Sequence, residues 1–295
     1  MTARIIDGKA IAKDVRAELI PRVQALGKRG ITPGLAFVLV GEHPASVTYV
    51  KGKAKDCAEV GIESETIRLP EDTAQQQVIE LVQRLNADDV WHGVLVQLPL
   101  PDHMDEEAVI ATVDPAKDVD GIHPQSMGKL MRGLPTYLGA TPHGVQQLLV
   151  RSGNPPDGKH VVVCGRSNLV GKPLAVLLAQ KRAGANATVT VCHTGTPDLG
   201  EMTRQADILV TAMGRAGTIT ADMVREGVVV IDVGMNAIPD ATKKSGHRLV
   251  GDVDFDAVSE KASAITPVPG GVGPMTRAML LVNTVIAAEG GPDSQ

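Results

Sequence analysis

The chain has 295 residues with a formal net charge of −5, and 43% of its residues are hydrophobic. This length suggests about two domains, each large enough to bury a core, and the composition excludes a disordered or fibrous protein. No run of Lys and Arg is present that could bind a nucleic-acid backbone or an anionic membrane. We therefore expect small-molecule partners, with neither nucleic acid nor a bilayer among them.

Targeting signals and metal motifs are not evident in the sequence. The first residues lack the apolar stretch of a signal peptide, and Asp7 and Asp14 argue against a transit peptide. The longest apolar stretch, residues 278–288, is shorter than the ~20 residues of a membrane span. Three cysteines without a CxxC, and histidines without HExxH spacing, offer neither a disulfide framework nor a zinc site. The sequence thus predicts a cytoplasmic protein without a bound metal.

Apolar strand-like segments alternate with helix-period segments along the whole chain. This alternation is typical of parallel sheets built from βαβ units, so we expect an α/β fold. In the first half, the pattern predicts strands at residues 35–40, 62–68 and 93–97 and helices at residues 44–60 and 73–86. A turn-rich stretch at residues 114–138 follows, and we interpret it as a linker and cleft wall at a domain boundary.

A second βαβ series follows this boundary. Thr141 is expected to cap a helix that runs to Arg151, with Pro142 in its first turn. The predicted strands lie at residues 160–164, 188–192, 207–211 and 228–232. The chain closes with the loop TPVPGGVGP and an apolar helix at residues 275–288.

The segment VVVCGRSNLVGKPLA, residues 161–175, predicts a phosphate site. It combines a buried strand, a tight turn at Gly165, Arg166 and Ser167, and the start of a helix. Free backbone N–H groups and the helix dipole would face an anion there. The spacing differs from the GxGxxG fingerprint, so an ordinary βα turn remains the alternative.

The following strand bears on the choice between NADP and NAD. NAD enzymes commonly end this strand in an Asp or Glu that binds the ribose hydroxyls, whereas this one ends in Cys192, His193 and Thr194. No carboxylate repels a 2′-phosphate, while hydroxyls and the charge of Arg166 can bind it. The sequence therefore favours NADP, with NAD less expected, and we interpret His193 as a loop residue.

A second group of polar residues falls in the first half. Tyr49 and Lys53 are four residues apart on the predicted helix and so share one face. Gln97 ends a predicted strand, and Asp118 and Asp120 follow in the segment KDVDG. Each has a simpler alternative, since a lysine is usually solvated, a strand-end amide binds backbone, and aspartates form turns.

Taken together, these segments resemble the bifunctional methylenetetrahydrofolate dehydrogenase/methenyltetrahydrofolate cyclohydrolase family over nearly the whole chain. Their order and spacing are more specific than a single glycine motif. The matching segments are PASVTYVKGKAKDCAEVGI (44–62), VLVQLPLP (94–101), DPAKDVDGIHP (114–124), GRSNLVGKP (165–173), VVIDVGMN (229–236), GDVDF (251–255) and TPVPGGVGPMT (266–276).

The resemblance implies roles for individual residues. Lys53 would be the catalytic lysine, supported by Gln97, with Tyr49 against the folate rings. Asp120 would bind the pterin, because a carboxylate offers two acceptors to adjacent N–H donors. The resemblance also places Gly165, Arg166, Ser167, Thr194 and Met235 around the dinucleotide, and Pro269, Gly270 and Gly273 beside the folate and nicotinamide.

The resemblance implies two domains with a cleft between them, and a homodimer. Residues 1–138 and 274–295 would form a discontinuous folate-binding catalytic domain, and residues 139–273 a Rossmann-like NADP-binding domain. The implied activity is NADP-dependent oxidation of 5,10-methylenetetrahydrofolate to the methenyl form, followed by hydrolysis to 10-formyltetrahydrofolate. Two alternatives are an NADP-dependent dehydrogenase of a small hydroxy or keto acid and a non-catalytic NADP-binding protein.

The chain departs from the family pattern at several positions. Gly139 and Ala140 stand where members commonly have PC before TP, and Gly195 stands where a basic residue is common. Residues 182–185 resemble an insertion. Arg277 replaces the small apolar residue usual after PMT.

Overall fold

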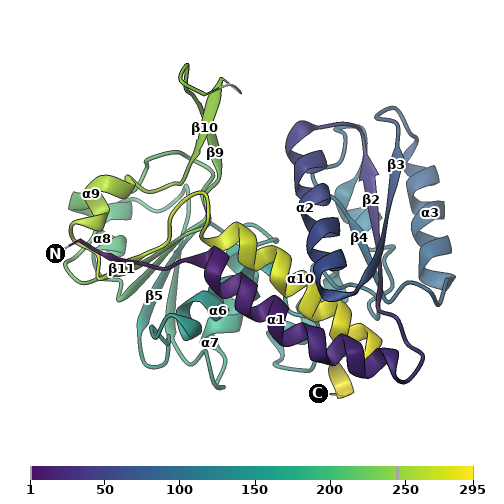
Figure 1. Cartoon of the computed structure of the whole chain (residues 1–295). Coiled ribbons are helices and arrows are strands. Elements are labelled where there is room, and N and C mark those ends of the chain that lie inside the picture. The colour runs from purple at the N-terminus through teal and green to yellow at the C-terminus, as the bar shows by residue number, and fades with distance from the viewer. Residues whose placement is uncertain (1, 244–245, 295) are drawn as a thin grey trace. The chain divides into compact units, whose positions relative to one another are not determined.

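The computed structural model describes residues 2–243 and 246–294. They form two compact units, each built around a parallel sheet (Figure 1). The six-stranded unit contains the residues up to Ala12 and Thr141–Thr276, and the three-stranded unit contains Lys13–Ala140 and the residues from Arg277 onward. The predicted α/β class is confirmed. None of the described helices is both long and apolar enough to cross a membrane.

The three-stranded unit has the strand order β3-β2-β4, with both pairs parallel. Its strands are β2 (Gly34–Val40), β3 (Glu63–Leu69) and β4 (Gly93–Val96). Because β2 is central, all seven of its residues are buried, as its continuous apolar sequence predicts. Alternate residues of β2, such as Ala36 and Val38, pack with Val78 and Val82 of α3 (Gln75–Ala87).

Helix α2 (Pro44–Val60) lies on the other face of this sheet from α3 (Figure 1). It begins at Pro44. Proline is tolerated in the first turn of a helix because the backbone N–H groups of that turn have no helical acceptor. It ends at Gly61, whose φ of 86° lets its N–H close back onto the Cys57 carbonyl at 3.1 Å. Both ends agree with the helix predicted for residues 44–60.

The remaining helices of this unit are most of α1 (Gly8–Gly27), α4 (Glu106–Ile110), α5 (Pro124–Met131) and most of α10 (Val272–Ala288), followed by a short 3₁₀ turn at Pro292–Ser294. The sequence predicted α10 but not α1, α4 or α5. Helix α5 lies within the stretch expected to be turn-rich. It begins because His123 accepts the Gln125 N–H through Nδ1, and Pro124 occupies the first turn.

The six-stranded unit has the strand order β1-β11-β8-β7-β5-β6, with every pair parallel. Its strands are β1 (Arg4–Ile5), β5 (His160–Cys164), β6 (Thr188–Cys192), β7 (Ile208–Thr211), β8 (Val229–Asp232) and β11 (Ala264–Ile265). The first residues differ from the expected boundary, which placed them with the folate domain. They join this unit because β1 pairs with β11, Arg4 opposite Ala264.

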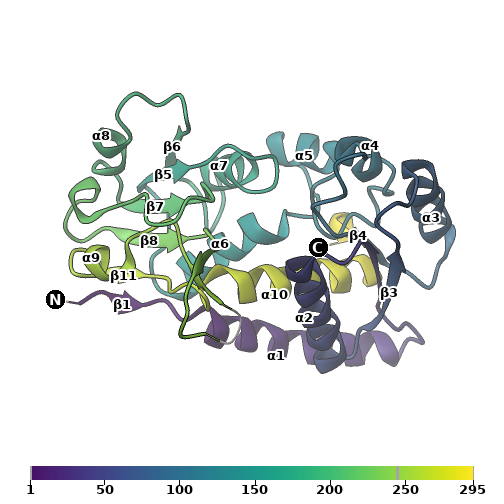
Figure 2. The same cartoon turned by 90° about the horizontal axis from the view of Figure 1, so that it is seen from above.

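Helices cover both faces of the six-stranded sheet, as Figures 1 and 2 show. One face carries α8 (Leu199–Thr203) and α9 (Phe255–Ser259), and the other carries α6 (Ala140–Arg151) and α7 (Gly171–Ala179). A 3₁₀ turn at Ala221–Met223 and a hairpin of β9 (Asn236–Pro239) and β10 (His247–Val250) complete the unit. Since α6 begins at Ala140, Thr141 lies inside the helix rather than at its cap.

The chain reverses direction across this sheet at β5. From β5 it passes to β6 on one side, and then crosses to β7 and β8 on the other side. In open parallel sheets, ligands bind beyond the carboxyl ends of the strands at such a switch point. The topology therefore directs attention to the segments that follow β5, β6 and β7.

Candidate active site

Tyr49, Lys53 and Gln97 lie together in the three-stranded unit. Tyr49 and Lys53 are one turn apart on α2, and the Lys53 Nζ lies 4.9 Å from the centroid of the Tyr49 ring. The same Nζ donates to Gln97 Oε1 at 3.1 Å. Lys53 is only 4% exposed, so it is not the solvated surface lysine that is the commoner case.

The side chain of Gln97 has a defined orientation. Gln97 follows β4, and its backbone N–H continues the sheet by donating to the Val38 carbonyl at 2.9 Å. Its Nε2 donates to the Leu98 carbonyl at 2.6 Å, which leaves Oε1 to face Lys53. The strand end thus presents a hydrogen-bond acceptor to the lysine amine.

Asp120 lies in a loop that is held from several sides. Asn283 of α10 donates through Nδ2 to the carbonyls of Val119 and Leu138, each at 2.8 Å. The Asp120 carbonyl accepts the Ala140 N–H at 3.2 Å. These contacts fix the backbone, so the half-buried Asp120 carboxyl has a defined place near Lys53.

Asp118 has a different environment from Asp120. It is buried, and its carboxylate accepts the N–H groups of Ile122 and His123 at 3.2 and 2.9 Å. Burial raises the pKa of Asp118 to about 6, against the lowering effect of its hydrogen bonds to Ser126 and to those N–H groups. Asp118 therefore shapes the loop in which Asp120 lies.

Burial and neighbouring charges shift the proton affinity of Lys53. Burial lowers its pKa, because an ammonium loses hydration in the interior, and the positive charge of Arg277 lowers it further. The negative charge of Asp120 acts in the opposite direction. Burial likewise raises the pKa of Asp120, while Lys53 lowers it. A lowered pKa increases the fraction of the amine that can accept a proton at a given pH.

The sequence did not identify Asp56 and Arg277 as part of this region. Asp56 lies on α2 three residues after Lys53, and its Oδ2 is 2.8 Å from the Nε of Arg277 on α10. Only two features of the sequence could have indicated their role, namely the helical spacing of Asp56 from Lys53 and the unusual residue at position 277. The contact itself joins segments far apart in the sequence.

Gly165 closes the turn after β5 in the six-stranded unit. Its φ of 132° is unfavourable for residues with a side chain, and a Cβ there would lie 2.3 Å from the carbonyl oxygen of Ala212, after β7. A Cβ on Gly171 would likewise lie 2.0 Å from the Gly165 carbonyl oxygen. Only glycines allow the turn to pack this closely at the switch point between β5 and β7.

The predicted dinucleotide residues lie at the carboxyl edge of this sheet. Arg166 and Ser167 follow β5, and Thr194 follows β6, whose last residue Cys192 pairs in register with Cys164. All three side chains are exposed, as is Met235 after β8. No side chain caps α7 at Val170. In its first turn the Lys172 N–H donates to the Ser167 carbonyl at 3.1 Å, and Pro173 has no N–H.

The turn after β6 contains hydroxyl and imidazole groups rather than carboxylates. His193 Nδ1 accepts the Gly195 N–H at 3.0 Å, and the His193 N–H donates to Thr196 Oγ1 at 2.9 Å. The imidazole therefore stabilises the turn, consistent with its interpretation as a loop residue. This donor set fits the 2′-phosphate of NADP better than the ribose hydroxyls of NAD.

Pro269, Gly270 and Gly273 lie between β11 and the first turn of α10, in the six-stranded unit. Gly270 has a φ of 114°, and a Cβ there would lie 3.3 Å from the Cε of Lys9. A Cβ on Gly8 would meet the Gly271 carbonyl oxygen at 1.8 Å. The loop therefore packs closely against the start of α1, whereas Tyr49, Lys53, Gln97 and Asp120 belong to the other unit.

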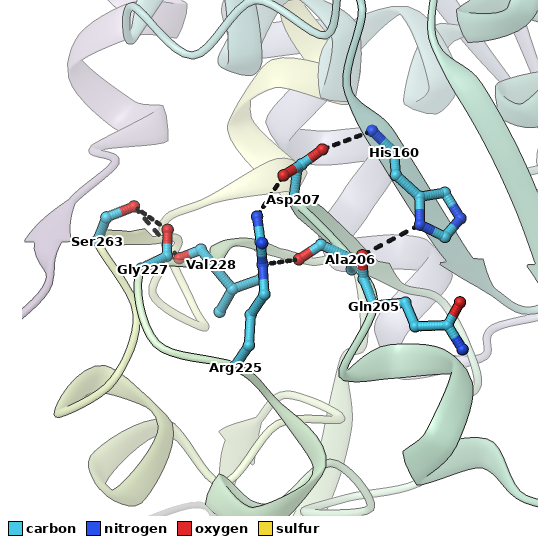
Figure 3. Close-up of polar contacts among 8 residues, drawn as sticks. All are labelled: His160, Gln205, Ala206, Asp207, Arg225, Gly227, Val228 and Ser263. Atoms are coloured by element: carbon cyan, nitrogen blue, oxygen red, sulfur yellow. Dashed lines mark hydrogen bonds and ion pairs between the residues drawn. The ribbon is translucent and has the colours of Figure 1, made fainter.

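A separate polar cluster lies at the amino-terminal edge of the six-stranded sheet (Figure 3). Asp207 accepts the His160 N–H at 2.7 Å and forms an ion pair with Arg225, whose Nε donates to the Ala206 carbonyl at 2.8 Å. The His160 hydrogen bond and the Arg225 charge lower the pKa of Asp207. These groups satisfy one another at the edge away from the ligand side, so we interpret the cluster as structural.

Metal and disulfide chemistry find no support in the part of the chain that the structure describes. Residues 2–243 and 246–294 contain no group of three or more His, Cys, Asp or Glu suited to a metal ion. Cys57, Cys164 and Cys192 are free and buried. Burial raises the pKa of Cys57 and of Cys164 to about 12, which suppresses the reactive thiolate.

Comparison with protein families matches both parts of the chain. A model described as the tetrahydrofolate dehydrogenase/cyclohydrolase catalytic domain matches residues 6–120. A second, described as the tetrahydrofolate dehydrogenase/cyclohydrolase NAD(P)-binding domain, matches residues 139–291. A "Bifunctional protein FolD" of Salinibacter ruber is 56% identical over 286 residues, which cover 97% of this chain and 96% of that protein. Another of Dehalococcoides mccartyi is 56% identical over 290 residues, 98% of each chain.

Solved structures show the same similarity. The bifunctional enzyme FolD of Campylobacter jejuni aligns with a TM-score of 0.91 at 48% identity, covering 97% of this chain and 99% of that one. The Trypanosoma brucei FolD, solved with NADP and an inhibitor, aligns with a TM-score of 0.93 at 40% identity, covering 98% of each. These matches favour the bifunctional folate enzyme over a dehydrogenase of small acids or a non-catalytic NADP-binding protein. With both family models and full-length relatives in agreement, the chain belongs to the tetrahydrofolate dehydrogenase/cyclohydrolase family.

Proposed function

We propose that the residues described above carry out both reactions of this bifunctional family. The chain oxidises 5,10-methylenetetrahydrofolate to 5,10-methenyltetrahydrofolate with NADP and hydrolyses the product to 10-formyltetrahydrofolate. The single observation that carries the proposal is the buried Lys53 amine, hydrogen-bonded to Gln97 and placed over Tyr49. We assign folate binding to the three-stranded unit and dinucleotide binding to the six-stranded unit.

The oxidation requires mainly that substrate and cofactor be positioned. When bound, NADP supplies the hydride acceptor. Hydride leaves the methylene carbon, and the lone pairs of the two adjacent nitrogens stabilise the cation that forms. Arg166, Ser167 and Thr194 would bind the cofactor with Met235 nearby, and the glycines of the loop at residues 269–273 would allow close approach of backbone. Lys53 transfers no proton in this step.

The hydrolysis requires a group that exchanges protons. Water adds to the methenyl carbon as Lys53 takes one of its protons through Nζ. The bond from that carbon to N5 then breaks while N5 receives a proton from Lys53. The remaining hydroxyl proton leaves as the formyl carbonyl forms, so one proton is released overall. The acceptor Gln97 Oε1 keeps Nζ directed, and burial lowers the pKa of the amine.

Asp120 and Tyr49 provide folate recognition in this proposal. The Asp120 carboxylate accepts the paired N–H donors of the pterin, and the Tyr49 ring packs against the folate rings. The hydrogen bonds of Asn283 to both sides of the 119–138 loop maintain the position of Asp120. Thus α10 contributes to the substrate site by fixing the backbone.

Incubation with methylenetetrahydrofolate and NADP tests the function. We expect reduced nicotinamide to appear together with 10-formyltetrahydrofolate, with methenyltetrahydrofolate as a transient intermediate by absorbance. Added methenyltetrahydrofolate should be hydrolysed without cofactor. Turnover of small hydroxy acids instead would support the rival dehydrogenase, and binding of NADP without turnover would support a non-catalytic protein.

We further propose that the chain is a cytoplasmic homodimer. Three free, buried cysteines fit a reducing compartment. Strand β3 is the edge of its sheet and has partly exposed residues along its length, so it offers a surface for pairing. Light scattering with size-exclusion chromatography should give twice the mass of one chain. A monomer at micromolar concentration would contradict the dimer.

A further inference from the structure

A buried ion pair lies next to the proposed catalytic lysine. Asp56 is 5% exposed and sits on α2 one turn beyond Lys53. Its Oδ2 is 2.8 Å from the Nε of Arg277, whose side chain is 30% exposed. Both residues belong to the three-stranded unit. The chemistry described above does not use this pair.

The pair rests on a single contact between Asp56 Oδ2 and Arg277 Nε, 2.8 Å apart. Neither atom has another hydrogen-bond partner among the described residues. Burying two charges costs hydration that only well-aligned hydrogen bonds restore. By contrast, Arg22 donates to both carboxylate oxygens of Glu289, at 3.0 and 2.6 Å. Stability alone therefore gives little reason for the Asp56 pair.

Arg277 also touches the backbone that carries Lys53. A Cβ on Gly52 would lie 2.6 Å from Arg277 Nη1, so the guanidinium rests directly on the residue before the lysine. Glycine is unfavourable inside a helix by about 1 kcal/mol relative to alanine. At this position its lack of a side chain permits the contact.

We propose that Arg277 is a positioning residue for the hydrolysis, which holds the turn of α2 that carries Lys53 and whose charge favours the uncharged amine. This inference rests on the proposed role of Lys53. The uncharged amine is the form that accepts a proton from water, so a nearby positive charge increases the fraction of enzyme ready to react.

The charges around both groups agree with this assignment. Burial and Arg277 lower the pKa of the Lys53 amine, while Asp120 favours the ammonium, as Cys57 would only if it were ionised. Asp56 faces Arg277, Arg16 and Glu59, and burial is the largest influence raising its pKa. Among the described residues, Arg277 is thus the one cation whose charge lowers the pKa of Lys53.

The pH profile of methenyltetrahydrofolate hydrolysis tests the proposal, with the spontaneous rate subtracted. The acid limb of this profile is the range in which the rate rises with pH as Lys53 loses its proton. In Arg277→Gln this limb should move to higher pH, and the rate at a fixed pH on the limb should fall about two- to fivefold. Arg277→Lys keeps the charge and should keep the limb in place. Asp56→Asn removes the negative partner and should move the limb to lower pH.

The opposite shifts expected for the acid limbs of Arg277→Gln and Asp56→Asn distinguish an electrostatic role of Arg277 from a purely structural one. Loss of a structural clamp would affect Arg277→Gln and Asp56→Asn in the same direction. Arg22→Met is the matched control, because it breaks an ion pair of the same unit away from Lys53 and should leave the limb unmoved. An unmoved limb in Arg277→Gln, or equal shifts in both variants, overturns the proposal.

A Lys53→Met variant distinguishes failure of this inference from failure of the proposed function. If Lys53→Met hydrolyses at the unmodified rate, the role of Lys53 is wrong and the inference falls with it. If Lys53→Met is inactive in hydrolysis while Arg277→Gln retains the unmodified pH profile, only the inference about Arg277 is wrong. Should Arg277→Gln fail to fold, Asp56→Asn still gives the test, because the proposal requires its acid limb to move to lower pH while that of Arg277→Lys stays in place.

Discussion

Asp118 and Asp120 are two residues apart, yet the structure gives their carboxyl groups different surroundings. The Asp118 carboxylate accepts two backbone N–H groups of its own loop and is buried. Asp120 is half-buried and interacts electrostatically with Lys53. The residue pattern alone predicted both as loop residues, and only the family resemblance distinguished Asp120 as the one that binds the pterin.

Replacing Asp120 with alanine tests its proposed contact with the pterin. A charged hydrogen bond contributes about 1.5–3 kcal/mol, so we expect folate affinity to fall by at least ~10-fold. NADP affinity should not change, because the dinucleotide residues belong to the other unit. Isothermal titration with each ligand measures both effects. An unchanged folate affinity would remove Asp120 from the site.

Asp118 predicts a pH dependence of stability. Its pKa of about 6 in the folded chain exceeds the ordinary value of 3.8, so the folded state holds a proton that the unfolded state has released. The resulting stabilisation is present below about pH 4 and is lost as pH rises to about 6. Relative to Asp118→Asn, the free energy of unfolding should fall by up to about 3 kcal/mol across this range. Denaturant titrations of both proteins at several pH values measure this difference. If the account is wrong, their free energies of unfolding will change with pH in the same way.

At the scale of elements, α10 supports the substrate loop through one side chain. Asn283 is buried, and its Nδ2 donates to the carbonyls of Val119 and Leu138. Asn283→Ala leaves both acceptors unpaired and should lower the free energy of unfolding by about 1–3 kcal/mol. The KM for folate should also rise severalfold, because the Asp120 loop loosens.

Asn86→Ala provides the matched control for this prediction. Asn86 of α3 makes comparable hydrogen bonds in the same unit, to Thr112 and Asp114, but it does not contact the Asp120 loop. It should lose similar stability in denaturant titrations while its KM for folate stays unchanged. Equal effects of both variants on KM would argue against a specific role of α10.

The turns after β5 and β6 carry the preference for NADP. Arg166 offers a charge to the 2′-phosphate, and Thr194 offers a hydroxyl. Arg166→Ala should raise the KM for NADP about 10-fold or more, since a hydrogen bond to a charged group is lost. The KM for NAD, which lacks that phosphate, serves as the internal control and should change little. Equal kcat/KM for NAD and NADP in the unmodified protein would contradict this assignment.

Predictability differs among the elements for physical reasons. Continuous apolar runs identified β2 and β5 because strands buried on both faces require them. Strand β1 has only two residues and no local pattern, and it exists because of its pairing with β11. Helix α5 was missed because its eight residues are too few to establish a helical period.

At the scale of the whole molecule, the sequence predicted the α/β class and the family from segments spread over the chain. It could place Tyr49 and Lys53 on one helix face, because that relation depends only on helical spacing. The contact of Asp56 with Arg277 joins α2 to α10, and no local pattern encodes it. Such relations appear only once the chain is folded.

The central claim is that Lys53 separates the two activities, because hydrolysis requires proton exchange and hydride transfer does not. Lys53→Met keeps the aliphatic stem and removes the amine. We expect its hydrolysis of methenyltetrahydrofolate to fall by ~10²–10⁴-fold, the range typical of a general acid or base, while NADP reduction falls much less.

The most direct measurement follows methenyltetrahydrofolate and reduced nicotinamide together during turnover of Lys53→Met. The account predicts that the methenyl compound accumulates in step with reduced nicotinamide, whereas the unmodified enzyme largely consumes it. Hydrolysis at the unmodified rate, with no accumulation, would contradict the account and leave Lys53 a buried structural residue.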